Sequence, residues 1–170
     1  SGNSTIDFRD PVRITLSMEP HQVPPGWLQG ATSPFARLTL KTDGPSVGWS
    51  RLFVNLTYPA DHPAYNPALY KLVLWRDDNL DSVWTTADVS LTVAAAGNSR
   101  AQLILNETLG ASPKTYFLTM RPAATVILAD EVSPQVVRTD LAFGPPGYFQ
   151  TPSAPGYLSV TLAEPPDYPG

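Results

Sequence analysis

Nineteen prolines in 170 residues restrict this chain to a fold without long helices. Proline lacks a backbone N–H and breaks the hydrogen-bonded ladder of a helix interior. Short runs of alternating apolar and polar residues are frequent instead, and turn-forming residues separate them. In one run, Leu38 and Leu40 share a face and Lys41 lies on the other. This alternation is typical of antiparallel sheets that have one face in water.

Nine such runs are spaced at fairly regular intervals along the chain and are predicted to be strands. They cover residues 12–16, 35–42, 51–57, 69–76, 89–93, 101–105, 115–120, 136–141 and 157–162. Many short strands separated by turns predict an all-β fold, here an Ig-like antiparallel β-sandwich with Pro-rich terminal arms.

The two ends of the chain differ from its middle. Residues 1–11 are polar and irregular, and we predict an N-terminal arm there. Residues 143–170 are rich in proline, glycine and aromatic residues, and we predict a Pro/Gly-rich C-terminal arm there, with 157–162 as a candidate terminal strand. The sandwich domain then covers residues 12–142. Pro-rich arms make few hydrogen bonds of their own, so either their own domain or a neighbouring copy must hold them.

Charge and composition restrict the partners and the environment. A net charge of -4 argues against nucleic acid, which requires a basic face. No apolar run reaches the length of a membrane span. The absence of cysteine fits a bacterial or archaeal surface protein and equally permits a cytosolic one. The start at Ser1-Gly2 predicts a processed or excised fragment.

Three N-glycosylation sequons, at Asn3, Asn55 and Asn106, would be used in a eukaryotic or archaeal surface protein. They favour an exported protein, so we expect an extracellular or cell-surface location.

Residues 77–88 hold four carboxylates and one amide, in a chain that has little other clustered charge. The spacing matches positions 1, 3, 5, 7 and 12 of a calcium loop, which are here Asp77, Asn79, Asp81, Val83 (through its carbonyl) and Asp88. Hard oxygen ligands at alternating positions suit Ca²⁺. The sequence therefore predicts a calcium site formed by these five residues.

Two positions depart from that loop. Ser82 stands where a glycine makes the sharp turn, and Asp88 stands where a bidentate glutamate is usual. The run that follows, 89–93, also alternates as a strand does. The alternative is an acidic hairpin loop whose Asp and Asn side chains cap turns through local hydrogen bonds. The sequence alone leaves both interpretations open.

The order of runs across the middle of the chain resembles a known family. An alternating strand at 36–40 and a second strand at 52–56 precede the segment 69–81, and strands at 101–105 and 115–119 follow. Over about residues 35–133 this order resembles the Ig-like repeat modules of large secreted bacterial surface proteins, although the loop lacks their usual Asn-Gly pairs. The resemblance implies an extracellular structural module without chemistry.

Catalytic motifs are weak in this sequence. There is no nucleophile elbow, phosphate loop or HExxH pair, and we interpret His21 and His62 as exposed loop residues. We predict a non-catalytic module or subunit of a cell-surface assembly whose partners are other copies or neighbouring surface modules. A terminal strand, 157–162 or 12–16, could be donated to a neighbouring copy or belong to its own sandwich.

The alternative function is a carbohydrate-binding module, since sugars stack on exposed aromatic rings. Trp27 lies in a Pro-Gly loop and Trp84 in the acidic loop, so we expect both to be more exposed than Trp49 and Trp75. Aromatic rings also pack against Pro-rich segments, which is the competing explanation for their number.

Overall fold

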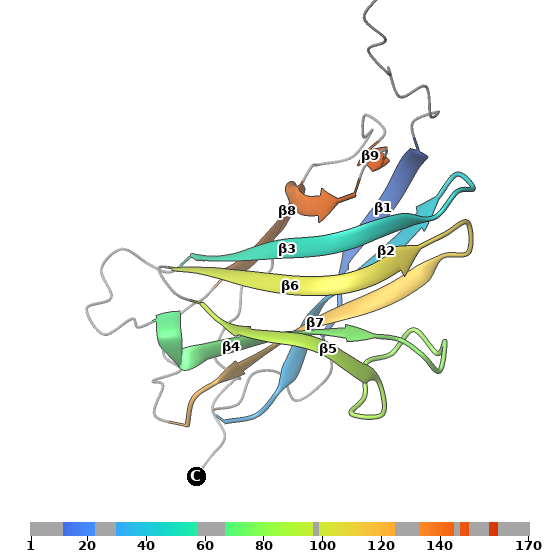
Figure 1. The fold of residues 1–170 in the computed structure, drawn as a ribbon. Coiled ribbons are helices and arrows are strands. Elements are labelled where there is room, and N and C mark those ends of the chain that lie inside the picture. The colour runs from blue at the N-terminus through green and yellow to red at the C-terminus, as the bar shows by residue number, and fades with distance from the viewer. Residues whose placement is uncertain are drawn as a thin grey trace, which may run out of the picture.

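The protein is described by a computed structural model, which covers residues 12–22, 30–57, 67–96, 99–124, 133–144, 147–149 and 157–159. Most of these residues lie in strands, which form two packed sheets (Figure 1), and this confirms the predicted all-β sandwich. In chain order the elements are β1 (Val12–Pro20), β2 (Ser33–Thr42), β3 (Val47–Thr57), the 3₁₀ turn η1 (Pro67–Leu69), β4 (Tyr70–Arg76), β5 (Val89–Ala95), β6 (Arg100–Leu109), β7 (Lys114–Pro122), β8 (Ser133–Phe143), β9 (Gly147–Phe149) and β10 (Tyr157–Ser159).

The larger sheet has six strands in the order β5-β4-β7-β2-β1-β9, and the smaller sheet has four in the order β10-β8-β3-β6. Neighbouring strands are antiparallel except β1 and β9, which are parallel. Each of the nine predicted runs overlaps a strand, and residues 160–162 of the last run lie outside the described residues. The additional strand, β9, has only three residues and no alternation to reveal it. None of the described residues forms a helix long and apolar enough to cross a membrane.

Parts of the predicted C-terminal arm pair with the sandwich of their own chain. Leu158 of β10 lies opposite Val136 of β8, and Tyr148 of β9 lies opposite Arg13 of β1. The other candidate for donation, 12–16, lies in β1 and pairs with β2. The structure therefore places both candidate segments, as far as it describes them, in their own sandwich. Residues 1–11 and 160–170 lie outside the described residues.

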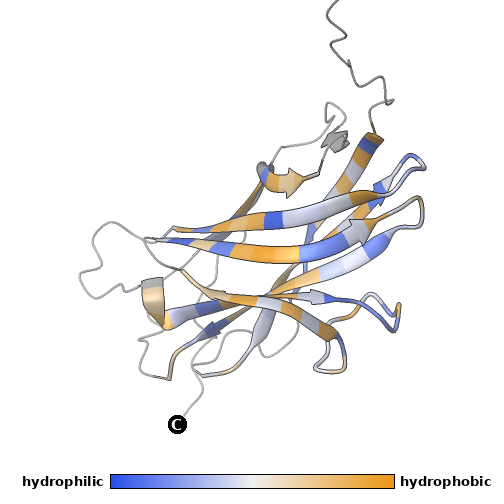
Figure 2. Cartoon of the chain, viewed as in Figure 1, coloured by the Kyte–Doolittle hydropathy of each residue, from blue (hydrophilic) through white to orange (hydrophobic). Residues whose placement is uncertain are grey.

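The hydrophobic core lies between the two sheets and follows from the alternation in the sequence (Figure 2). Leu38 and Leu40 are buried and Lys41 is exposed, as predicted. The inward side chains of β3 include those of Leu52 and Val54, together with Trp49, which is completely buried.

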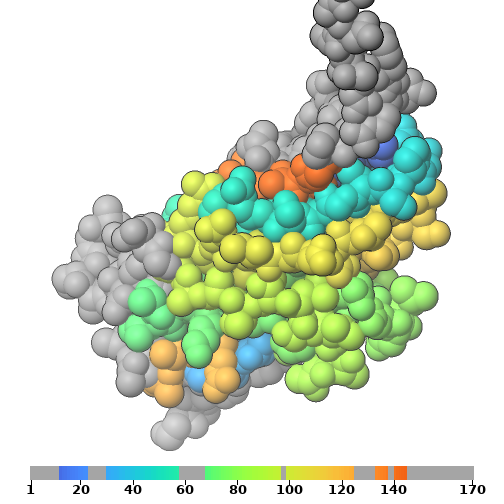
Figure 3. All heavy atoms as spheres, in the orientation of Figure 1, coloured from blue at the N-terminus to red at the C-terminus, as the bar shows by residue number. Residues whose placement is uncertain are grey.

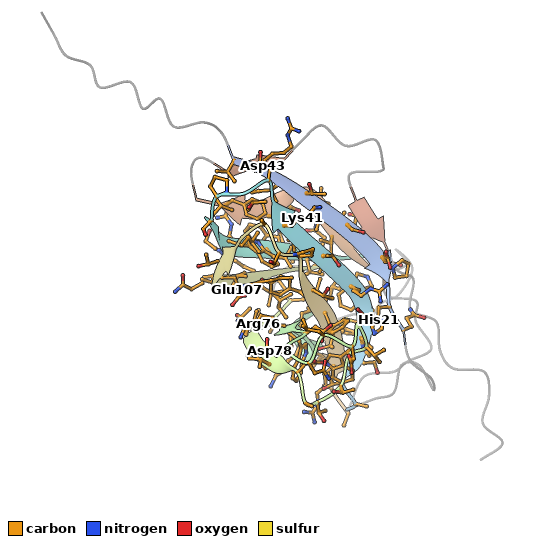
Figure 4. All side chains as sticks on the ribbon, turned by 90° about the vertical axis from the view of Figure 1, so that its right-hand side faces the viewer. His21, Lys41, Asp43, Arg76, Asp78 and Glu107 are labelled. Atoms are coloured by element: carbon orange, nitrogen blue, oxygen red, sulfur yellow. The ribbon has the colours of Figure 1, made fainter. Side chains whose placement is uncertain are left out.

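One polar network crosses this core and joins the two sheets. Glu107 of β6 in the smaller sheet is only 7% exposed. Its carboxylate accepts hydrogen bonds from Arg76 Nη1 of β4 at 2.8 Å and from the Tyr116 hydroxyl of β7 at 2.9 Å. Burial, and then the Glu107 carboxylate, raise the pKa of Tyr116, which therefore stays protonated as a donor. Arg76 also bonds to Asp78, and Figure 4 shows these three charged residues close together.

Candidate functional site

The acidic segment forms the hairpin loop that joins β4 to β5, at the outer edge of the larger sheet (Figure 1). Arg76 and Val89 are the last paired residues below the loop. Asp77 comes directly after Arg76, and Asp88 comes directly before Val89. The two aspartates therefore flank the base of the hairpin from opposite strands. Asp77 is also fixed to the sheet, because its backbone N–H donates to the Thr115 carbonyl of β7 at 2.9 Å.

The two carboxylates at the base are buried and only partly satisfied. Asp77 is 4% exposed and Asp88 is 6% exposed. Oδ2 of Asp77 accepts the Ser82 N–H at 2.9 Å, and Oδ2 of Asp88 accepts the Thr85 N–H at 2.7 Å. Oδ1 of each is buried and has no hydrogen-bond partner among the described residues. Desolvation, followed by the charge of Asp77, raises the pKa of Asp88.

The tip of the loop is exposed and held by local hydrogen bonds. Asn79 Nδ2 donates to Asp81 Oδ2 at 2.9 Å, and Asn79 Oδ1 accepts the Asp81 N–H at 3.3 Å. Asp81 Oδ1 accepts the Val83 N–H at 2.9 Å. The two bonds from the Asp81 and Val83 N–H groups are the side chain-to-backbone bonds of Asx turns, as the hairpin-loop interpretation predicts.

Ser82 and Leu80 adopt positive φ angles of 61° and 60°. Ser82 therefore takes up the left-handed conformation that glycine would supply at the sharp turn of a calcium loop.

The predicted ligands thus fall into two groups. Asp77 and Asp88 lie at the buried base, while Asn79, Asp81 and Val83 lie at the exposed tip. In the described part of the chain, no three acidic or histidine side chains are grouped in a way that could hold a metal ion. The five-residue calcium site remains a prediction.

Residues far away in sequence fix the loop to the larger sheet. The Ser82 carbonyl accepts a hydrogen bond from Arg37 Nη1 at 3.1 Å, and the same guanidinium pairs with Glu19. The Trp84 N–H donates to Nε2 of His21 at 3.2 Å. His21 is half-buried with its ring 5.0 Å from that of Phe117, which corrects the interpretation of it as an exposed loop residue. Its companion, His62, lies outside the described residues.

The bond from Trp84 to His21 requires a neutral imidazole, so it predicts a pH-dependent stability. Burial, and then the charge of Arg37, lower the pKa of His21. Its stabilising contribution is therefore present above the unfolded pKa of about 6.5 and is lost as the pH falls through the lowered folded value. We expect the free energy of unfolding to fall by about 1 kcal/mol more in the native protein than in His21→Phe as the pH drops to about 5. Urea unfolding at several pH values measures this difference. If the free energy of unfolding changed with pH by the same amount in both proteins, the prediction would be wrong.

The aromatic candidates for sugar binding are only partly described. Trp84 is half-buried and packs edge to face on Trp75 with 5.6 Å between ring centroids, and its Nε1 is buried without a partner among the described residues. Trp84 is more exposed than Trp49, as predicted, but Trp75 is half-buried too. Trp27 lies outside the described residues.

The sequons also occupy different environments. Asn106 is exposed on β6, whereas Asn55 is half-buried and donates from Nδ2 to Asp140 at 3.4 Å. Asn3 lies outside the described residues.

Next to the loop, β5 forms the outer edge of the larger sheet and carries no charged residue. Among the described residues, the exposed large hydrophobic side chains all lie on the loop, on β5 or on the adjacent β6; they are Leu80, Val83, Val89, Val93 and Ile104. β5 packs beside β6, which forms an edge of the smaller sheet, and Figure 3 shows the two strands next to each other on one side of the molecule. We call this surface the β5 edge patch.

No protein-family model and no curated protein matches the sequence. One solved structure with a similar arrangement is that of AvmM, described as catalysing macrocyclization in alchivemycin A biosynthesis. It aligns over 93% of this chain and 93% of its own, with 9% identity and a TM-score of 0.41. At this level the likeness carries no conclusion about activity.

Proposed function

We propose that the protein is a non-catalytic structural module of an extracellular cell-surface assembly, and that it joins a second copy through β5. The observation that carries this proposal is the uncharged, apolar edge of the larger sheet. An edge strand presents unpaired N–H and C=O groups, and proteins that stay apart usually protect such strands with charges, prolines or inward-pointing ionised residues. The resemblance to Ig-like surface modules supports the same role and location.

The two edge strands on this side of the sandwich differ in that protection. β6 carries Arg100 on its outward face and points the charged side chain of Glu107 inward. β5 has neither device. The register between β4 and β5 shifts between Leu74 and Trp75, which leaves a bulge at Leu91. Bulges also protect edge strands, so 92–95 is the regular and unprotected part of this edge. Val93, which is 60% exposed, lies within that part.

The partner that we propose for this edge is β5 of a second copy of the protein. Two antiparallel β5 strands related by a two-fold axis would extend the six-stranded sheet across both copies. The same contact would cover Val93 in each copy. Main-chain hydrogen bonds would supply affinity, and the apolar side chains would exclude water from the joint.

Replacing Val93 by lysine tests this contact, because a charge at the centre of an edge strand opposes pairing. We expect the native protein to dimerise with rising concentration in sedimentation velocity, and Val93→Lys to weaken dimerisation at least about tenfold, a change of about 1.4 kcal/mol. Asn106→Lys is the matched control, since it adds the same charge at an exposed position of β6. A native protein that stays monomeric up to about 1 mM would contradict the proposal, as would a Val93→Lys variant that dimerises normally.

Carbohydrate binding is the second candidate, and the half-exposed Trp84 supports it. Its ring stands at 73° to that of Trp75, so a sugar could stack on one ring but not on a flat platform of both. Glycan-array binding that Trp84→Ala abolishes while dimerisation persists would favour this function over the structural one.

A further inference from the structure

We propose that Asp77 and Asp88 bind a calcium ion at the base of the 77–88 loop. This ligand site is independent of the association through β5. The hairpin brings its two carboxylates together from opposite strands.

The observation that points to a cation is the state of the four carboxylate oxygens. One oxygen of each side chain accepts a backbone N–H of the loop, from Ser82 or Thr85. The other oxygen of each is buried and has no hydrogen-bond partner among the described residues. Burying a charged oxygen without a partner is costly, and two carboxylates flanking one hairpin base also repel each other. A bound cation would remove both penalties.

The nearby basic side chains do not fill this role. Arg76 bonds to Asp78 and Glu107. Arg37 bonds to Glu19 and to the Ser82 carbonyl rather than to either carboxylate at the base. Neither arginine pairs with the carboxylates at the base, so within the described part of the chain their negative charge is left for a ligand from solution.

The donor atoms favour calcium among the common cations. The two side chains offer only oxygen, which suits hard cations rather than zinc or copper. Ca²⁺ accepts an irregular shell of six to eight oxygens that includes backbone carbonyls and water, whereas Mg²⁺ requires a near-ideal octahedron. Two carboxylates with carbonyls and water are enough for such a shell. Asn79 and Asp81 bond to each other at the tip, so they would join the shell only after the loop rearranges.

Thermal unfolding with CaCl₂ or EDTA provides the first test. At a Kd of about 10⁻⁴ M, which is typical of extracellular modules, about 5 mM Ca²⁺ should raise Tm by roughly 5–9 °C. MgCl₂ at the same ionic strength should give less than half that shift. Equal Tm values in CaCl₂ and EDTA would overturn the proposal. Equal Tm shifts with CaCl₂ and MgCl₂ would also overturn it.

Terbium luminescence provides a second readout that does not depend on stability. Tb³⁺ replaces Ca²⁺ in oxygen sites, and Trp84 in the same loop can sensitise its emission. We expect luminescence on adding TbCl₃ that excess CaCl₂ displaces. The double variant Asp77→Asn, Asp88→Asn should lose at least about tenfold in affinity, because amides replace both charged ligands. Emission that survives in the double variant would overturn the site.

Asp78→Asn is the matched control, because it removes the same charge from the same loop at an exposed residue that bonds to Arg76. It should keep the calcium shift and the terbium signal. Asp88→Asn should in addition be at least as stable as the native protein in EDTA and less stable in CaCl₂. A merely structural role for Asp88 would lower stability equally in both solutions, which would count against the proposal.

Discussion

Replacing Glu107 by alanine is expected to lower the free energy of unfolding by about 3 kcal/mol. The substitution removes the acceptor of two hydrogen bonds and leaves the Tyr116 hydroxyl, which is completely buried, without its partner. It also leaves Arg76 with one carboxylate fewer. The expected loss is at the lower end of the range for buried pairs, because the Arg76 side chain is 31% exposed and keeps its bond to Asp78.

Thermal and urea unfolding measure this effect, and Tm should fall by roughly 6–12 °C. Asp78→Ala is the matched control, since Asp78 bonds to the same guanidinium from an exposed position and should cost at most about 1 kcal/mol. Tyr116→Phe should cost about 1–3 kcal/mol, and its effect should not add to that of Glu107→Ala, because both remove the same bond. If Asp78→Ala and Glu107→Ala lowered the free energy of unfolding equally, burial of Glu107 would not explain the larger effect that we expect for Glu107→Ala.

Trp49→Ala is expected to cost about 3–5 kcal/mol, the range for deleting a buried tryptophan. The Trp49 side chain is completely buried and extends from the smaller sheet to the larger one. Its ring meets that of Tyr116 edge to face at 4.9 Å and lies 6.3 Å from that of Phe143. Its Nε1 donates to the Arg51 carbonyl at 3.0 Å, so alanine would leave both a cavity and an unused acceptor.

Ile104→Ala is the control for Trp49→Ala in equilibrium unfolding. Ile104 lies on β6, the strand paired with β3, but it is 66% exposed, so its truncation should change stability by at most about 0.5 kcal/mol in dilute solution. Trp49→Phe should lose less than Trp49→Ala, because phenylalanine keeps part of the contact with Tyr116. Similar losses for Trp49→Ala and Ile104→Ala would show that Trp49 does not support the packing between the sheets.

The strands could be predicted from the sequence because their signal is local. Alternation with a period of two fixes which side chains of a strand share a face, and burial of Leu52 and exposure of Lys41 follow from it. β9 could not be predicted, since three residues contain no period and the strand exists only through its pairing with β1. For the same reason the sequence left open whether 157–162 belongs to its own sandwich, and the pairing of Leu158 with Val136 is a property of the folded chain.

The acidic loop likewise combines features that the sequence predicts with features that it does not. Local spacing was enough to predict the turn-capping bonds of Asn79 and Asp81, because those bonds span only two residues. It could not show that Asp77 and Asp88 would be separated from them at the buried base. The bond from Trp84 to His21 spans 63 residues, and that from Arg76 to Glu107 spans 31. A local pattern carries no information about partners at such distances, since packing of the sheets determines which strands become neighbours. The sequence by itself determined an all-β chain with an acidic hairpin loop. Only the tertiary structure decided that two of the loop's carboxylates would be buried with unpaired oxygens beside an uncharged edge strand.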